Sequence, residues 1–516
     1  MRRILVRITR CGLAALAIVS SACAQQIQQK DTSAGQEPVA LTIYNQSFAV
    51  ARTSLDLELQ PGLNEITTTR VTGMLEPDSV VLRDASTHLP IPVLEQNYDA
   101  AVVNQQWLLQ KYEGKTIDFQ VSTPQGLQPM PGKIIRAGFN RPPSYGPNGQ
   151  YINGQQGEPL IEINGHMQFS LPGLPLFPSA TDGLLLKPTL RWQINSKSPA
   201  HLMAELAYIT GGFDWDATYN VIAPENNDVT SGEKVDVLGW VTIHNQSGSD
   251  FGQARIKLMA GDVAKIRNAG FGAGMGGALA KSAVVLAADE AVPGVTQKAF
   301  DDFHLYDLNR TVALRDGETK QVQFIEAAGV TMKRSYLYSG LGVQVQPLYA
   351  GNVNQNQGYG LGNENTKVLI VEEIKNSESN HLGMPLPAGR VRLYRRDSDG
   401  QMEFVGESTI GHTPAEETLK IATGSAFDVK GSRRQTNFHV DYNNHQIDES
   451  FEIKISNQKL QDANVSVIEQ MYRCENWEIT SKTAEFKKRD SHTLEFPLQV
   501  PAKGSAVLDY TVHYTW

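Results

Sequence analysis

Apolar and polar residues alternate with a period of two along much of this chain, and this pattern constrains its fold more than any other. From Leu55 to Gln60 every second residue is leucine, and Pro61-Gly62 then provides a turn. From Leu508 to Trp516, apolar and aromatic residues alternate with polar ones. A period of two places every second side chain on one face of a β-strand. We therefore predict a mainly β protein whose last strand lies against a core.

Local signals predict one hairpin and two short helices. Val391 to Tyr394 and Met402 to Val405 flank a polar turn at residues 395–400, which is typical of a β-hairpin. Helical patterns are scarce. The spacing of apolar residues predicts a short helix at Gln105 to Tyr112, and a second is expected around Thr296 to Phe303.

A loose motif occurs three times in the chain: an alternating strand, an asparagine, several polar residues and a second strand. Its asparagines are Asn245, Asn376 and Asn457. Short strands joined by polar turns are typical of antiparallel sandwiches of the immunoglobulin type. The three instances are not regularly spaced, which argues against a solenoid or a propeller.

Changes in composition divide the chain into several pieces. We expect several antiparallel immunoglobulin-like β-sandwich domains, a small β-barrel-like insertion and few short helices. Segments rich in Gly, Pro, Asn and Gln predict a loop at Phe139 to Gly157 and exposed connectors at Gly270 to Gly277 and Gly351 to Gly362. The expected divisions are a leader (1–24), an N-terminal sandwich (25–113), the insertion (114–190), a middle sandwich (191–347), a linker (348–364) and a C-terminal sandwich (365–516).

The first 24 residues have the layout of a secretory signal peptide. Four arginines precede a short apolar run from Gly12 to Val19, and small residues follow that run. We expect export to the periplasm, the outer membrane or the outside of a bacterial cell. Two cleavages fit: one before Gln25, and one that leaves Cys23 as a lipidated first residue. Arg2-Arg3 also leaves twin-arginine export open.

Composition and charge disfavour several classes of protein. Hydrophobic residues make up 41% and charged residues 20%, as in an ordinary globular protein. Without the four leader arginines, 42 basic residues face 55 acidic ones, a net charge of −13, so nucleic acid and anionic membranes are poor partners. No run of about 18 apolar residues follows the leader, so no transmembrane segment is expected. Cys474 is isolated, and we expect no intramolecular disulfide.

Several motifs along the mature chain resemble a known bacterial family. In chain order they are Leu206 to Tyr219, Gly239 to Thr242, Leu258 to Asp262, His304 to Leu308, Gly317 to Lys320, Met384 to Arg390, Arg433 to Thr436 and the closing strand. Together they are similar to the family named only as domain of unknown function 4139. That family is related through its C-terminal domain to mucoidy inhibitor A-like proteins, whose helical coiled-coil region this chain lacks. The resemblance implies an exported, mostly β protein and supplies no catalytic residues.

The densest candidate site is the strand from Phe213 to Tyr219. Its aromatic residues alternate with polar ones, so one face could stack on a sugar while the other offers carboxylates. The candidate ligand residues are Asp214, Trp215, Asp216 and Tyr219. The interpretation that we favour is that the aromatic face is core and the acids are solvated.

A second candidate gathers four residues of metal-ligand type within ten positions: His439, Asp441, His445 and Asp448. Two imidazoles beside carboxylates suit zinc or another transition metal. Their spacing matches no zinc motif, and residues 442–445 also predict a polar hairpin tip. We therefore expect no metal and no other cofactor.

Three further motifs favour structural explanations. Asp397 to Gly400 resembles the start of a calcium loop, but Ser408 stands where the twelfth-position acid belongs, which favours a turn. Gly272 to Gly277 matches a nucleotide-binding pattern without the preceding apolar strand, which favours a loop. Arg473 beside Cys474 favours a thiolate, but a nucleophile also needs a histidine brought near by folding, so we interpret Cys474 as a structural thiol.

These observations favour an exported cell-envelope protein that binds or scaffolds and performs no chemistry, with an envelope protein or a surface glycan as partner. The alternative is a carbohydrate-binding or carbohydrate-active protein that uses Asp214 or Asp216 near exposed aromatic residues. A third possibility is a metal-dependent protein that uses the residues around His439.

Overall fold

The computed structural model describes most of the chain beyond the leader. The described residues are 27–30, 38–100, 104–124, 126–138, 144–145, 151–152, 157–178, 186–225, 232–265, 295–341, 353–360 and 365–516. The chain divides into two compact units: unit 1 comprises Met1–Glu37 and Arg52–Tyr208, and unit 2 comprises Pro38–Ala51 and Ile209–Trp516. The finer domain boundaries stay a prediction.

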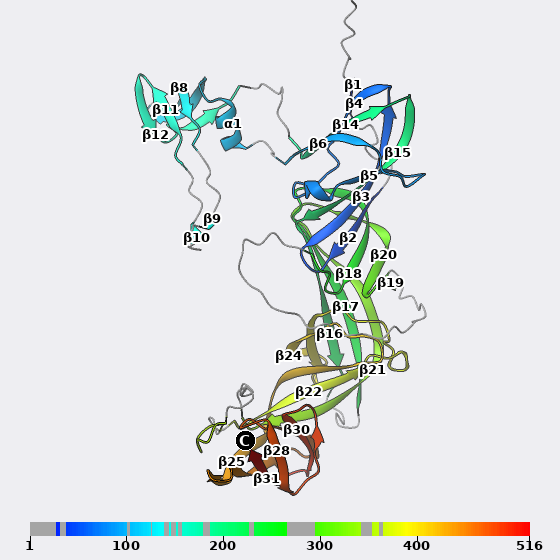
Figure 1. Ribbon diagram of the computed structural model, residues 1–516, viewed down its shortest axis with the longest axis vertical. Coiled ribbons are helices and arrows are strands. Elements are labelled where there is room, and N and C mark those ends of the chain that lie inside the picture. Colours follow the sequence, from blue (N-terminus) through cyan, green and yellow to red (C-terminus); the bar gives the residue numbers. More distant parts are fainter. Residues whose placement is uncertain are drawn as a thin grey trace, which may run out of the picture. The chain divides into compact units, whose positions relative to one another are not determined.

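The fold is mainly β, as the alternation predicts: strands account for 65% of the residues and helices for 3%. Several sheets are present, and α1 is the one α-helix in the described ranges (Figure 1). None of the helices in those ranges is long and apolar enough to cross a membrane.

The elements have the following bounds. Those wholly within unit 1 are β1 (Ile27–Lys30), β4 (Gly62–Thr68), η1 (Pro77–Ser79), β5 (Val81–Asp84), β6 (Val93–Asp99), α1 (Gln105–Lys111), β7 (Thr116–Thr123), β8 (Gly126–Arg136), β9 (Ser144–Tyr145), β10 (Tyr151–Ile152), β11 (Leu160–Ile163), β12 (His166–Phe169), β13 (Leu174–Leu176) and β14 (Thr189–Ser196). Two strands contribute residues to both units, β3 (Phe48–Leu59) and β15 (Ala200–Gly211). Those wholly within unit 2 are β2 (Val39–Tyr44), β16 (Phe213–Ala223), β17 (Glu233–Asn245), β18 (Phe251–Ala260), β19 (Thr296–Phe300), β20 (Phe303–Leu314), β21 (Thr319–Ser339), β22 (Lys367–Lys375), η2 (Glu378–Asn380), β23 (Gly389–Arg396), β24 (Met402–Ile410), β25 (Thr418–Asp441), β26 (Gln446–Asn457), β27 (Ala463–Gln470), β28 (Asn476–Lys482), β29 (Lys487–Lys488), β30 (Thr493–Val500) and β31 (Ser505–Thr515).

Strands of unit 1 follow the predicted alternation. β14 lies between β4 and β6 with antiparallel pairing, and β1 pairs with β4 in parallel. Trp192 of β14 is 1% exposed. In β3 the leucines from Leu55 to Leu59 are buried, and β4 begins at Gly62, so the predicted strand and turn are confirmed.

A second sheet of unit 1 has five antiparallel strands in the order β12-β11-β8-β7-β13. α1 confirms the predicted helix, and Asn104 caps it by accepting a hydrogen bond from the Trp107 backbone. The barrel-like closure expected here stays a prediction. The small core beside α1 consists of Leu109, Ile117, Phe119, Ile134, Ala137 and Ile161.

The described part of unit 2 contains three successive groups of four strands with the same pairing. We call them repeat 1 (β17, β18, β20 and β21), repeat 2 (β22 to β25) and repeat 3 (β26, β27, β30 and β31). In each repeat the first strand pairs antiparallel with the fourth, and the second pairs antiparallel with the third. The motif with an asparagine after a strand marks the first strand of each repeat.

A parallel pair recurs with each repeat, which the prediction of antiparallel sandwiches missed. The second strand of a repeat pairs in parallel with a strand from earlier in the chain: β18 with β2, β23 with β16 and β27 with β21. These partners are far apart in sequence, so alternation within either strand carries no information about the pairing or its direction.

β21 and β25, the fourth strands of repeats 1 and 2, are shared with the next repeat, because each also pairs with the first strand of that repeat. β21 pairs with β17 as far as Met332 and with β22 from Met332 to Tyr338. β25 pairs with β22 as far as Lys430 and with β26 from Val429 onward. One hydrogen-bonded ladder therefore passes from each repeat into the next (Figure 1). The predicted linker at 348–364 lies between β21 and β22, which pair directly with each other.

The two strand pairs of repeat 3 enclose a core between them. Phe451 and Tyr510, from the first and fourth strands, lie with Phe496 of the third strand, and the ring centroids of Phe496 and Tyr510 are 5.7 Å apart. β31 confirms the predicted closing strand, because every second residue from Leu508 to Tyr514 is buried.

The repeated asparagine has the same structural role in all three repeats. Asn245, Asn376 and Asn457 are each 0% exposed at the end of the first strand. Each side-chain amide donates to a carbonyl in the loop that follows its strand and to carbonyls at or just after the end of the third strand, which provides them with a donor where strands give way to turns. The acceptors are Ser249 and Leu314 for repeat 1, Met384, Thr413 and Pro414 for repeat 2, and Gln461, Val500 and Pro501 for repeat 3.

The turn before the fourth strand is also repeated. Two residues ahead of that strand, Gly317, Glu416 and Lys503 have left-handed φ values of 72°, 66° and 52°. This backbone costs a residue with a side chain roughly 1–2 kcal/mol, which glycine avoids. Repeat 1 is therefore the repeat whose turn is free of this strain.

Two other local predictions have different outcomes. β23 and β24 form the predicted hairpin, and Asp397 to Gly400 lie in its turn rather than in a calcium loop. The helix predicted around Thr296 to Phe303 is wrong: β19 and β20 pair antiparallel there, and Asp301, at φ 55°, turns the chain between them. Cross-strand pairing overrode a weak helical spacing.

The repeated turn predicts a stability difference between two glycine substitutions. Gly317→Ala should lower the free energy of unfolding by about 1–2 kcal/mol, because an added Cβ meets no atom within 4 Å and only the left-handed backbone is strained. Gly252→Ala is the matched control, since its Cβ also meets nothing and its φ is not left-handed. Urea denaturation of both variants checks this; equal effects would contradict it.

The buried asparagine of repeat 3 predicts a larger loss. Asn457→Ala should lower the free energy of unfolding by about 3 kcal/mol, because the carbonyls of Gln461, Val500 and Pro501 lose their donor and the backbone N–H of Lys459 loses its acceptor. Asn443→Ala, on the exposed β25–β26 turn, should change it by less than about 0.5 kcal/mol. Thermal melts of both variants test the difference, and similar melting temperatures would disprove the capping role.

Candidate functional site

The strand considered as a sugar platform, β16, turns its aromatic face into the core. Phe213, Trp215 and Tyr219 are 1%, 3% and 2% exposed. The Trp215 ring packs edge-on against Tyr306, and the Tyr219 hydroxyl donates to the backbone carbonyl of Pro387 at 2.7 Å. These buried rings cannot stack on a sugar, so the ligand role considered for Trp215 and Tyr219 is closed to them.

The acids of the same strand lie on its outer face. Asp214 and Asp216 are exposed, and the Asp216 carboxylate is 3.7 Å from His244 Nε2. Partial burial raises the pKa of Asp214 above its ordinary value. The outer face of β16 thus carries the two carboxylates, while the aromatic residues of the same strand lie on its other face.

The four residues of metal-ligand type are engaged in separate contacts. Asp448 pairs across strands with His439, and its carboxylate lies 2.7 Å from His513 Nδ1. Asp441 accepts from the backbone N–H groups of the hairpin tip, which lower its pKa. His445 packs its ring against Trp516. Across the described residues, no three His, Cys, Asp or Glu side chains are grouped so as to hold a metal ion.

The remaining predicted residues have simpler positions. Cys474 is a free, buried thiol that donates to the backbone carbonyls of Asn476 and Thr515, and burial raises its pKa. A raised pKa disfavours the reactive thiolate. Cys23 and the segment from Gly270 to Gly277 lie outside the described residues.

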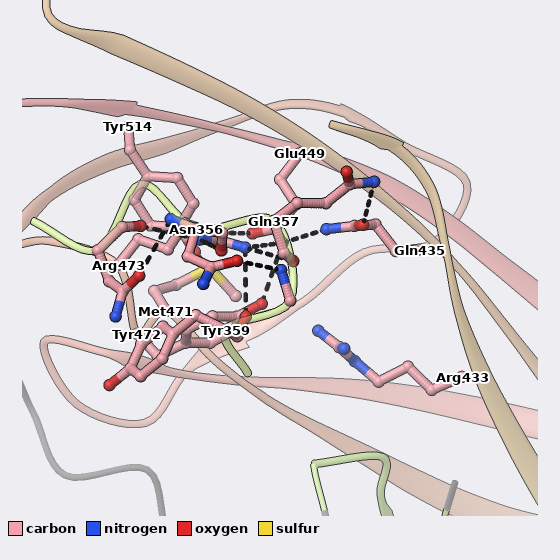
Figure 2. Close-up of polar contacts among 12 residues, drawn as sticks. Asn356, Gln357, Tyr359, Arg433, Gln435, Glu449, Met471, Tyr472, Arg473 and Tyr514 are labelled. Atoms are coloured by element: carbon pink, nitrogen blue, oxygen red, sulfur yellow. Dashed lines mark hydrogen bonds and ion pairs between the residues drawn. The ribbon is translucent and has the colours of Figure 1, made fainter. Parts of the chain in front are cut away.

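A buried ion pair that the sequence analysis missed lies inside repeat 3 (Figure 2). Glu449 of β26 and Arg473, which follows β27, have side chains that are 0% exposed. Arg473 donates from Nη2 to Glu449 Oε1 at 2.7 Å and from Nε to Oε2 at 2.9 Å. Burial works to lower the pKa of Arg473, but the hydrogen bonds and charge of Glu449 raise it overall, so the guanidinium stays charged.

Arg473 also fastens segment 353–360 to the core of repeat 3. Its Nη atoms donate to four backbone carbonyls of that segment, of Asn354, Asn356, Gln357 and Tyr359, at 2.8, 2.9, 3.5 and 3.2 Å (Figure 2). The prediction of an exposed connector therefore holds only for the middle of this segment, at 356–358. The group that binds its carbonyls, the guanidinium of Arg473, lies far from the segment in the sequence.

Glu449 gathers two further donors. The hydroxyl of Tyr472 donates to its Oε1 at 3.1 Å, and Gln435 Nε2 donates to the same atom at 2.6 Å. Burial raises the pKa of Tyr472, which keeps the phenol protonated as a donor. The carboxylate is thus surrounded by donors, as a buried charge must be.

A second ion pair lies nearby in the same repeat. Arg433 Nε is 3.0 Å from Glu469 Oε2, with the two side chains 4% and 0% exposed. The Tyr510 hydroxyl also donates to Glu469, and the Arg433 guanidinium lies 3.7 Å from the Phe451 ring centroid. Arg433 thereby connects the inner faces of the two strand pairs.

Two comparable ion pairs link other strands of unit 2. Arg395 of β23 is 2.6 Å from Glu233 of β17, and Arg334 of β21 is 2.6 Å from Glu372 of β22. Both glutamates are 1% exposed at the side chain. Burial raises the pKa of Glu372. Breaking such a pair leaves one buried charge without compensation, which is costly.

The sequence signal that could have identified the buried acids is their position in the two-residue alternation of a strand. Glu449 alternates along β26 with Ile447 and Phe451, and all three side chains face the core. Glu469 likewise continues the buried series of Val465 and Val467 in β27. A carboxylate in an apolar series needs a partner. The arginines come from other strands and loops, so no local pattern identifies them.

The two buried ion pairs of repeat 3 hold parts of the chain in position and do not present reactive groups to solvent. The two carboxylates and two guanidiniums are balanced in charge and closed to solvent. The groups that they bind are the backbone of a chain segment and neighbouring side chains.

No family model matches the chain, and no curated protein matches it.

Two neighbouring arginines on β25 provide a matched test of this group. Arg433→Met should lower the free energy of unfolding by about 3–5 kcal/mol, because Glu469 stays buried without its partner. Arg434→Met breaks an ion pair with Glu452 on the exposed face and should cost at most about 1 kcal/mol. Urea denaturation measures both, and equal losses would contradict the role assigned to the buried pair.

Proposed function

We propose that this protein is an exported, non-catalytic binding or scaffolding protein of the bacterial cell envelope. The observation that carries the proposal is the sharing of β21 and β25 between successive repeats. Adjacent repeats are joined by backbone ladders instead of by linkers. Such a construction suits a protein that holds a fixed arrangement of surfaces for partners.

The shared strands resist bending at the junctions between repeats. β21 has 21 residues and β25 has 24, which at about 3.3 Å per residue gives contour lengths of roughly 70 and 80 Å. Moving one repeat relative to the next would break ladder hydrogen bonds and expose buried side chains. Arg334 and Glu372 add an ion pair between β21 and β22, where repeat 1 passes into repeat 2.

The proposed location depends on the leader and on the family resemblance. The arginine-rich start and the short apolar run of residues 1–24 support export. The resemblance to domain of unknown function 4139 supports the same location and a mostly β protein without an assigned reaction. The partner in this proposal is an envelope protein.

The carbohydrate-active alternative predicts a different result, and an experiment can separate the two. Tagged protein would be cross-linked in cells of the source bacterium, beside a variant that carries Asp214→Asn and Asp216→Asn. We expect the same cross-linked envelope protein with both, because neither acid supports the fold from its exposed position. Purified protein should release no product from cell-wall glycan.

Two outcomes would contradict the proposal. One is glycan cleavage by the original protein that the double variant lacks, which would establish a hydrolase. The other is the absence of any cross-linked envelope protein when the tagged chain is present at its natural level.

A further inference from the structure

Three strands of unit 2, β16, β21 and β25, have an edge at which a later strand can pair in parallel. At two of these three edges a later strand is paired. β16 pairs with β17 on one side and, over Ala217–Ala223, with β23 in parallel on the other. β21 pairs with β22 on one side near its end and, over Tyr336–Ser339, with β27 in parallel on the other. In both cases the second strand of a later repeat occupies the edge.

β25 is the third strand of this kind. It pairs with β26 as far as Asp441, and with β22 on its other side as far as Lys430. The Gly431 backbone then donates to Thr366 on that side. Beyond it, no described strand pairs with this side of residues 432–441, which we call the β25 edge.

The later strands are engaged elsewhere, so they leave the β25 edge unfilled. β26 and β31 pair with each other, β27 and β30 form the second strand pair of repeat 3, β28 pairs with β31, and β29 pairs with β30. Nothing in the described part of the chain continues the series with a strand for this position.

An unfilled edge offers a row of backbone N–H and C=O groups to an extended peptide. We propose that the β25 edge binds an extended segment of a partner protein, which adds to it as a parallel strand. This inference rests on the proposed function and gives it a location. The series itself indicates the occupant, because the chain fills the two equivalent edges with parallel strands of its own.

The chemistry of the occupant follows from those two strands. In β23, Val391 and Leu393 are each 1% exposed, and in β27, Val465 and Val467 are 1% and 0% exposed. Alternate apolar residues of the added strand are thus covered, while the residues between them are less buried. The partner segment should show the same alternation.

The side chains at the β25 edge fit such a strand. Phe438 and Val440 are half-buried on the inner face, whereas Asn437 and His439 are exposed on the outer face. Segment 353–360 flanks the inner face through a 3.5 Å contact from Gln357 to Gln435 and forms no strand pair with β25. An added strand would therefore meet apolar side chains on one face only.

A peptide with the sequence of residues 461–470, QDANVSVIEQ, is the probe for this edge, because it carries β27. Added to the mature protein at ten times its dissociation constant, it should slow hydrogen exchange by about tenfold at those amides of Asn437–Asp441 that point to the β25 edge. A control peptide with aspartate in place of Val465 and Val467 should have no effect. Unchanged exchange with QDANVSVIEQ, or protection confined to another region, would overturn the proposal.

Proline variants test whether backbone pairing is the cause. Along an antiparallel strand, successive N–H groups point alternately to its two sides, so one of His439→Pro and Val440→Pro removes a bond to β26 and the other blocks the free edge. Each is compared with alanine at the same position. One proline variant should keep its alanine control's melting temperature and lose peptide binding; binding by both prolines would contradict the site.

The peptide and cross-linking results separate this inference from the proposed function. If the edge-blocking proline leaves the cross-linked envelope protein unchanged, the site is wrong while the scaffold proposal stands. If QDANVSVIEQ binds but no envelope protein is cross-linked in cells, the scaffold proposal fails. A dimer of this chain with the same protection at Asn437–Asp441 would overturn the assignment of the edge to a different protein.

Discussion

The continuous backbone ladder along β21 and β25 is the interaction on which the rest of unit 2 depends. Each strand completes one repeat and begins the next, so hydrogen bonds that would close a separate domain instead connect two. The buried asparagines complete this scheme where the ladder ends, because they satisfy carbonyls that leave the sheet. In the described part of the chain the cysteine, Cys474, is free, so the ladder and the cores hold this part together without a disulfide.

The buried ion pairs add specificity to a framework that apolar packing alone would leave less defined. Arg473 has a fixed set of acceptors, four of them carbonyls of segment 353–360, and apolar side chains could not select those atoms. Replacing such pairs by apolar residues is often neutral for stability in proteins. We therefore attribute to them the position of that segment, and to the ladder and the core most of the folding free energy.

Sequence alternation predicts most of the local structure and little of the long-range pairing. The leucines after Leu55, the hairpin around Gly400 and the closing strand all follow from a period of two, because that period belongs to a single strand. The parallel pair of β27 with β21 joins residues more than a hundred positions apart, and no local pattern contains it. For the candidate site, the ambiguity at Trp215 was which face of a strand is buried, and only the packing of Phe251 and Tyr306 against the aromatic face of β16 decides it. Glu449 was detectable by its position in the two-residue alternation, but Arg473 was not.

The parallel pairing of each repeat with earlier strands gives folding a direction. β23 pairs with β16, and β27 pairs with the end of β21, so each of these repeats forms against a strand edge that an earlier part of the chain provides. A chain that becomes available from its N-terminus can therefore build its repeats in order, each one templating the next. In the reverse order, later strands would stay unpaired until earlier strands far away in the sequence had formed. Pairing them would then carry the entropic cost of closing long loops. Nucleation at the N-terminal end of unit 2 is the route that this topology favours.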